Sequence, residues 1–218
     1  MSTGDVNYIF RGLRIQARAT VFYTNFTDAI ETSFFFAEGL LGDQADFVNE
    51  IITGVSKKNI GAELSFEYQV VPSVKLIAVG SFGQFTYNNN PNLVLTSGTF
   101  PNGLNYEEAN LKNYKIAGGP QRAASIWFEY RDPKYWWFGT TANFFSNAYL
   151  DVSSLTRTKN FYLETDGFPF PDYDPTLARA LLTQEKFESY MVINAVGGKS
   201  WRIGKKYLGL FVSLNNLL

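Results

Sequence analysis

The sequence predicts an all-β fold, an antiparallel transmembrane β-barrel of which about eight strands are present. Three observations indicate it: long stretches that alternate between apolar and polar residues, abundant aromatic residues, and short turns that alternate along the chain with long polar segments. Alternation with a period of two gives a strand one apolar and one polar face. Soluble strands usually end after about 5–6 residues, whereas a tilted strand needs about 9–11 to cross a bilayer. The length of the stretches therefore favours a membrane barrel.

The clearest alternating stretches read GLRIQARATVFYT, NIGAELSFEYQVV and GLFVSLNNL, and SIWFEYR is a shorter one. We expect their apolar residues to face lipid, among them Ile15, Ala17, Ala19, Ala62, Leu64, Phe66, Leu210 and Val212. We expect their polar residues to line the lumen, among them Arg14, Arg18, Glu63, Glu67 and Ser213. A register slip of one residue would place cations in hydrocarbon, at about 2–4 kcal/mol each near mid-depth. The charged lumen residues either pair with one another and with whatever fills the lumen, or line the path of a transported ligand.

Four short turn signals join the expected strands into hairpins, because Gly or Pro stands at each reversal. The signals are Arg11-Gly12, Val71-Pro72-Ser73, Asp132-Pro133-Lys134 and Ile203-Gly204-Lys205-Lys206. In chain order, the strands that they join are expected at 4–11 and 13–31, 56–71 and 74–87, 116–131 and 135–150, and 185–202 and 207–218. The hairpins are separated by three long polar segments, 32–56, 88–115 and 151–184.

Short turns at one end and long loops at the other are typical of bacterial outer-membrane barrels, with the turns periplasmic and the loops extracellular. The long loops are therefore the expected place of ligand contact, since rings in polar loops offer flat surfaces for sugars or peptides. The candidate ligand-binding residues are Phe34, Phe35, Tyr106, Tyr162, Phe168, Phe170 and Tyr173. An alternative of equal weight is that these rings pack the loops against one another.

The composition excludes several classes of function. The chain has no Cys and no His, which excludes a Ser-His-Asp triad, a His-ligated zinc and a His-ligated haem within it. The net charge is −1, which argues against nucleic-acid binding. Asp166, Asp172 and Asp174 could bind calcium or form a glycosidase pair, but a solvated acidic loop is the favoured interpretation. We therefore expect no enzyme activity, no cofactor and no metal.

The two ends of the chain predict that it is part of a larger barrel. The first residues, MSTGDVNYIFRG, lack the basic and apolar regions of a signal peptide. The last residues, NNLL, lack the closing aromatic residue with which complete outer-membrane barrels generally end. The alternative is a self-contained eight-stranded outer-membrane barrel with an adhesion or structural role.

Residues 118–158, GGPQRAASIWFEYRDPKYWWFGTTANFFSNAYLDVSSLTRT, resemble a late barrel segment of TonB-dependent outer-membrane receptors of the Bacteroidetes group. The matching residues are Pro120, Gln121, Glu129, Tyr130, Arg131, Pro133, Lys134, Tyr135, Trp136, Asn143, Tyr149, Asp151, Ser153, Arg157 and Thr158. GGKSWRIGKKYLGLFVSLNNLL is similar to a segment near the C-terminus of these receptors, and GLRIQARATVFYTNFTDAI is similar to another of their strands.

The resemblance implies the C-terminal part of a barrel of about 22 strands that holds a plug domain. It implies that residues 1–218 form a single partial barrel domain, an open curved sheet, with the plug and the TonB box elsewhere. The implied function is import of large nutrients of the glycan, peptide or iron-chelate class. The implied partners are outer-membrane lipid, the remaining barrel, the plug and the TonB system, with a surface-exposed lipoprotein as a further candidate.

Overall fold

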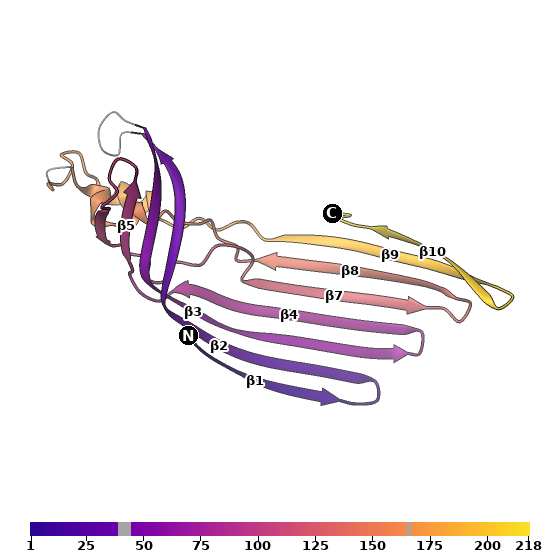
Figure 1. The fold of residues 1–218 in the computed structure, drawn as a ribbon. Helices are drawn as coiled ribbons and strands as arrows, with labels where there is room; N and C mark the ends of the chain where they lie inside the picture. The colour runs from indigo at the N-terminus through magenta and orange to yellow at the C-terminus, as the bar shows by residue number, and fades with distance from the viewer. Residues whose placement is uncertain (39–44, 165–166) are drawn as a thin grey trace.

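The computed structural model describes residues 1–38, 45–164 and 167–218 as one curved antiparallel sheet with a smaller assembly of loops at one end (Figure 1). Ten strands belong to this sheet. They are β1 (Ser2–Arg11), β2 (Ile15–Ala37), β3 (Asp46–Val71), β4 (Val74–Tyr87), β5 (Asn92–Ser97), β6 (Leu104–Glu108), β7 (Arg122–Arg131), β8 (Trp136–Ser146), β9 (Tyr190–Ile203) and β10 (Lys206–Leu214).

The sheet is open. Its main strands follow the order β1-β2-β3-β4-β7-β8-β9-β10, so β1 and β10 lie at opposite edges (Figure 1). Within the described residues, no strand pairing joins β1 to β10. The prediction of an open curved sheet is therefore confirmed, and the alternative of a self-contained eight-stranded barrel is wrong for this chain.

The eight main strands occur where the sequence predicts them, with shifted ends. β2 begins at Ile15 rather than at residue 13, because the Gly12 N–H donates to the Ile15 carbonyl and closes a longer turn. β7, β8 and β9 are shorter than expected where they meet the loops. There the side-chain amide of Gln121 replaces strand-to-strand hydrogen bonds, because it donates to the carbonyls of Phe85 and Ile116.

The register confirms that each strand has one apolar and one polar face. Between β2 and β3, Ala17 lies opposite Phe66 and Ala19 opposite Leu64, whereas Arg18 lies opposite Ser65. The pairings of the other strands extend both faces across the sheet. The residues that share the apolar face include Ile15, Ala17, Ala19, Ala62, Leu64, Phe66, Leu210 and Val212. Arg18, Glu63, Glu67 and Ser213 share the polar face.

The prediction that residues 32–56 form a loop is wrong, because β2 and β3 continue through most of this segment as a paired hairpin. We call residues 29–37 and 46–55 the arm. The arm turns away from the direction of β1, β4, β7 and β8 (Figure 1). The bend coincides with two register shifts, where Asp28 and Gly54 adopt positive φ angles of 56° and 72°. Such bulges bend a strand and increase its twist.

The other two long segments are also folded. β5 pairs with β3 along the arm, and β6 pairs with β5. Residues 151–184 contain the 3₁₀ helices η1 (Leu155–Arg157) and η2 (Lys159–Tyr162) and the short helix α1 (Pro175–Leu181). We call the arm together with the described parts of 88–121 and 147–189 the crown. Among the residues that the structure describes, no helix is long and apolar enough to cross a membrane.

The crown has its own hydrophobic core. Leu93 and Leu95 of β5 and the loop residue Leu111 are fully buried, and each such side chain contributes about 1.5–3 kcal/mol. The whole cluster comprises Val48, Ile52, Val55, Tyr87, Leu93, Leu95, Ala109 and Leu111. This core holds the arm against the two other long segments and so fixes the shape of the cavity described next.

Candidate functional site

A cavity of about 720 Å³ lies in the crown, between the arm and residues 151–155. This volume is within the range of about 300–1,000 Å³ that is usual for small-molecule sites. Its lining combines carboxylates, hydroxyls, rings and aliphatic groups: Glu31, Thr32, Ser33, Phe35, Glu50, Ile52, Tyr87, Asp151, Val152, Ser153, Ser154 and Leu155. We call it the crown cavity.

Two of the three carboxylates of the crown cavity come from the arm. Glu31 of β2 forms an ion pair with Lys57 and accepts a hydrogen bond of 3.1 Å from the Tyr87 hydroxyl. Glu50 of β3 is 9% exposed and accepts a hydrogen bond of 2.5 Å from the Ser33 hydroxyl. Ser33 and Glu50 meet because they are directly opposite each other in the ladder of the arm. The hairpin register therefore places both carboxylates on the cavity wall.

The third carboxylate, Asp151, is exposed and comes from the facing segment. Burial raises the pKa of the Tyr87 hydroxyl, and the negative charges of Glu31, Asp151 and Glu50 raise it further. The Lys57 ammonium lies 5.1 Å from the centre of the Tyr87 ring. With three carboxylates and no Lys or Arg in the described lining, the crown cavity is negatively charged.

The segment that carries Asp151 is held in place by Arg157 of η1, which is 8% exposed. Its guanidinium donates to the Ser153 carbonyl at 3.0 Å and to the Leu182 carbonyl at 3.0 Å. The guanidinium also lies 4.9 Å from the centre of the Tyr114 ring, a cation–π geometry. Arg157 thus ties residues 151–155 to the loop before β7 and to the end of α1.

A second hollow, of about 300 Å³, lies in the main sheet, with polar-face residues in its lining. Small side chains, among them Ser65, Ser81 and Ser125, leave space between larger ones. Arg18 borders the hollow and donates at 3.0 Å to Asn7 of the neighbouring strand. Ser125, which lines the hollow, bonds at 2.8 Å to Asn143 on the next strand.

Comparison with known proteins identifies the family. The family model described as "TonB dependent receptor-like, beta-barrel" matches residues 3–217. This chain belongs to the TonB-dependent receptor β-barrel family. TonB-dependent receptors are outer-membrane transport proteins and not enzymes, so the open sheet is part of a receptor barrel. A comparison with curated proteins and one with solved structures give no match.

The receptor structure places the predicted ligand-binding aromatics in several separate parts of the crown. Phe35 lines the crown cavity, and Tyr106 packs against the crown core. Phe34 lies on the opposite side of the arm from Phe35, is 63% exposed, and stacks on Phe47 with ring centres 5.2 Å apart.

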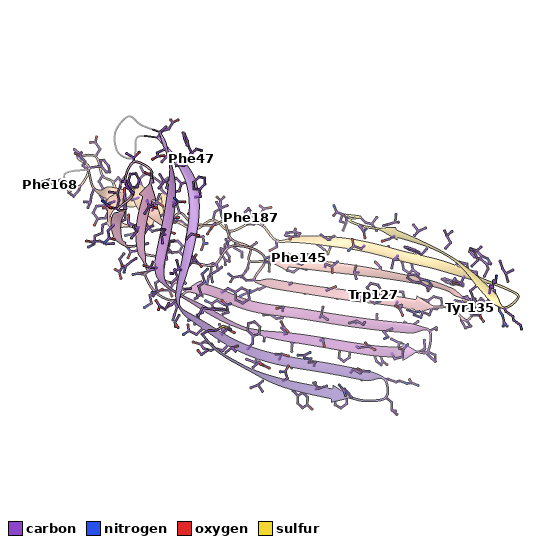
Figure 2. All side chains as sticks on the ribbon, in the orientation of Figure 1. Phe47, Trp127, Tyr135, Phe145, Phe168 and Phe187 are labelled. Atoms are coloured by element: carbon purple, nitrogen blue, oxygen red, sulfur yellow. The ribbon has the colours of Figure 1, made fainter. Side chains whose placement is uncertain are left out.

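The remaining predicted aromatics belong to the third long segment. The ring centres of Tyr162 and Tyr173 lie 5.5 Å apart, and Phe170 is exposed. Phe168 lies at the far end of the crown (Figure 2). Of the seven predicted aromatics, only Phe35 is among the described residues that line the crown cavity. Ligand contact by all seven stays a prediction.

Of the four charged residues expected to line the receptor lumen, Arg18 and Glu63 both line the hollow of the main sheet, and Arg14 and Glu67 do not. Arg14 lies in the turn before β2, outside the strand in which the sequence placed it. Glu67 forms an ion pair of 2.8 Å with Lys75, and Arg18 bonds to Asn7. In the described part of the chain, no ion pair joins these four residues to one another. That they line the lumen stays a prediction.

One of the acidic loop residues has a structural role. Asp174 caps α1, because its carboxylate accepts the Thr176 N–H at 2.7 Å. Asp166 lies outside the described residues. In the ranges that the structure describes, no group of three or more acidic, His or Cys side chains could hold a metal ion.

Sequence reasoning missed Glu31, Glu50, Tyr87 and Asp151 of the crown cavity. Glu50 sits in the alternating run FVNEIIT, and recognising this run as a strand would have placed Glu50 on the same face as Val48 and Ile52. Asp151 was one of the residues that carry the family resemblance, but nothing local indicates that it faces Glu50.

Proposed function

We propose that this chain forms wall and crown of a receptor that imports large nutrients of the glycan, peptide or iron-chelate class. The observation that supports this most is the combination of a two-faced sheet with a folded, cavity-bearing crown at one end only. The crown would make the first ligand contacts, including those predicted for Phe34, Phe35, Tyr106, Tyr162, Phe168, Phe170 and Tyr173. Transport would then run along the polar face.

In this proposal the crown is extracellular, the short turns are periplasmic and the polar face lines the lumen. The energetic support is the cost of the reverse arrangement. With the polar face outward, Arg18 would sit in hydrocarbon, at about 2–4 kcal/mol near mid-depth. The apolar residues of the same strands match lipid instead. Glu63, Glu67 and Arg18 would then meet whatever fills the lumen.

The proposed partners follow from the family. The edges at β1 and β10 would pair with the rest of the barrel, because unpaired backbone groups are costly in lipid. A plug domain would lie against the polar face, and the TonB system would supply the energy for transport. A surface-exposed lipoprotein is a candidate partner for the crown. The assignment to a receptor of the Bacteroidetes group stays a prediction.

Shortening the crown tests the proposal. We expect deletion of residues 167–173 in the complete receptor to reduce uptake of its nutrient without affecting insertion. The deletion removes Phe168, Phe170 and Tyr173 but keeps Asp174, which caps α1. Uptake by cells with and without TonB is measured, and heat-resistant migration of the folded barrel reports insertion. Unchanged uptake would remove this loop from the ligand site, and lost insertion would make it a structural element.

A further inference from the structure

We propose that the crown cavity binds a basic side chain, Lys or Arg, of an oligopeptide. This inference rests on the proposed import function and specifies the ligand class. The cavity supplies two requirements of a basic side chain: carboxylates for the cationic head and apolar surface for the stem. Lys and Arg carry such stems and bury them along apolar surface while the head keeps polar partners.

The first requirement is met by Glu50 and Asp151. Glu31 is already paired with Lys57, so its charge is largely compensated within the chain. In the residues described, no Lys or Arg forms an ion pair with Glu50 or Asp151. An incoming ammonium or guanidinium would therefore find two carboxylates that have no cationic partner.

Glu50 has the geometry of a ligand acceptor. It is 9% exposed, lines the cavity and accepts from the Ser33 hydroxyl. A carboxylate has about four acceptor positions, so one hydroxyl donor leaves most of its capacity unused. A buried carboxylate without a cationic partner is costly, and a bound cation would offset that cost.

The second requirement is met by the walls between the carboxylates. Phe35 and Ile52 from the arm face Val152 and Leu155 from the opposite segment, and all four line the cavity. The three carboxylates do not form a set that could hold a metal ion within the described residues. A sugar would stack on an open ring, but the Lys57 ammonium lies over the Tyr87 ring. A cationic group with an aliphatic stem fits this lining best.

Binding of tetralysine to the complete purified receptor tests the inference. We expect measurable binding that weakens as salt is raised, and at least about tenfold weaker binding of tetralysine with all four side-chain amines acetylated. Asp151→Asn should weaken tetralysine binding by about three- to tenfold, and Glu50→Gln by more. The matched control is Glu108→Gln, an exposed carboxylate of β6 outside the cavity lining, and it should bind as the parent does.

Several outcomes would overturn the inference. Equal binding of tetralysine and its acetylated form would do so, and so would unchanged affinity in both Asp151→Asn and Glu50→Gln. Because Asp151 is exposed, its substitution stays informative even if Glu50→Gln disturbs the arm. Preferred binding of a glucosamine tetramer would assign the site to an amino sugar instead of a peptide. TonB-dependent uptake without tetralysine binding would reject this inference alone. Asp151-dependent binding without TonB-dependent uptake would reject the transport function alone.

Discussion

Leu64→Arg should prevent most of the receptor from inserting as a folded barrel. Leu64 lies on the apolar face in the middle of the crossing part of β3, opposite Ala19 and Gly80. An Arg at the midplane of the lipid face costs about 2–4 kcal/mol. This is a large part of the 5–15 kcal/mol or so by which folded proteins are usually stable. The folded fraction is read from heat-resistant migration after insertion into vesicles, with urea titration to obtain the change in stability.

The matched control places the same cation on the other face. Ser81 of β4 lies on the polar face, opposite Glu63, so Ser81→Arg gains a carboxylate neighbour and avoids lipid. We expect Ser81→Arg to insert nearly as well as the parent. Equal loss of insertion in the two variants would contradict the assignment of the faces, and a loss confined to Ser81→Arg would reverse it.

Arg157→Ala should loosen the crown while leaving the barrel wall intact. The substitution removes two hydrogen bonds to backbone carbonyls and the contact with the Tyr114 ring. Hydrogen bonds from charged groups contribute about 1.5–3 kcal/mol each, so we expect the crown to lose about 3–6 kcal/mol of local stability. Limited proteolysis should cleave the crown at least about tenfold faster, with unchanged heat-resistant migration.

The control for Arg157 is Arg179, an exposed residue of α1 in the same segment. Arg179→Ala removes the same charge without removing a described buried contact, and should leave the proteolysis rate near that of the parent. An Arg157→Ala crown as resistant as the parent would show that the core of Leu93, Leu95 and Leu111 suffices to hold residues 151–155. The loss of barrel migration would show that the crown and the wall unfold together.

The main sheet was predictable because its chemistry is local. A strand such as β3 alternates between apolar and polar residues over Ile60–Val70, and the Pro72 turn fixes its hairpin with β4. The arm was not predicted, because the bulges at Asp28 and Gly54 shift the phase of the alternation. Beyond these two positions, the alternation of apolar and polar residues is out of phase with the alternation that identifies the rest of β2 and β3.

The crown cavity could not be assembled from the sequence, since its residues come from distant parts of the chain. Glu50 and Asp151 line the same cavity only because β5 and the core position residues 151–155 beside the arm. Gln121 and Arg157 are among the residues that carry the family resemblance, but their roles can be seen only in the structure. Gln121 bonds to the backbone of Phe85, and Arg157 holds the loop segment. Such contacts depend on the tertiary arrangement and leave no periodic signal.

Labelling of single cysteines in living cells tests the central claim, that this chain is a receptor wall with its crown outside and its turns inside. The chain has no Cys, so Asp172→Cys in the crown and Lys205→Cys in the β9–β10 turn each introduce one thiol. With a membrane-impermeant thiol reagent, we expect Asp172→Cys to label in intact cells. Lys205→Cys should label only after the outer membrane is permeabilised. Labelling of Lys205→Cys in intact cells, with Asp172→Cys protected, would contradict the account.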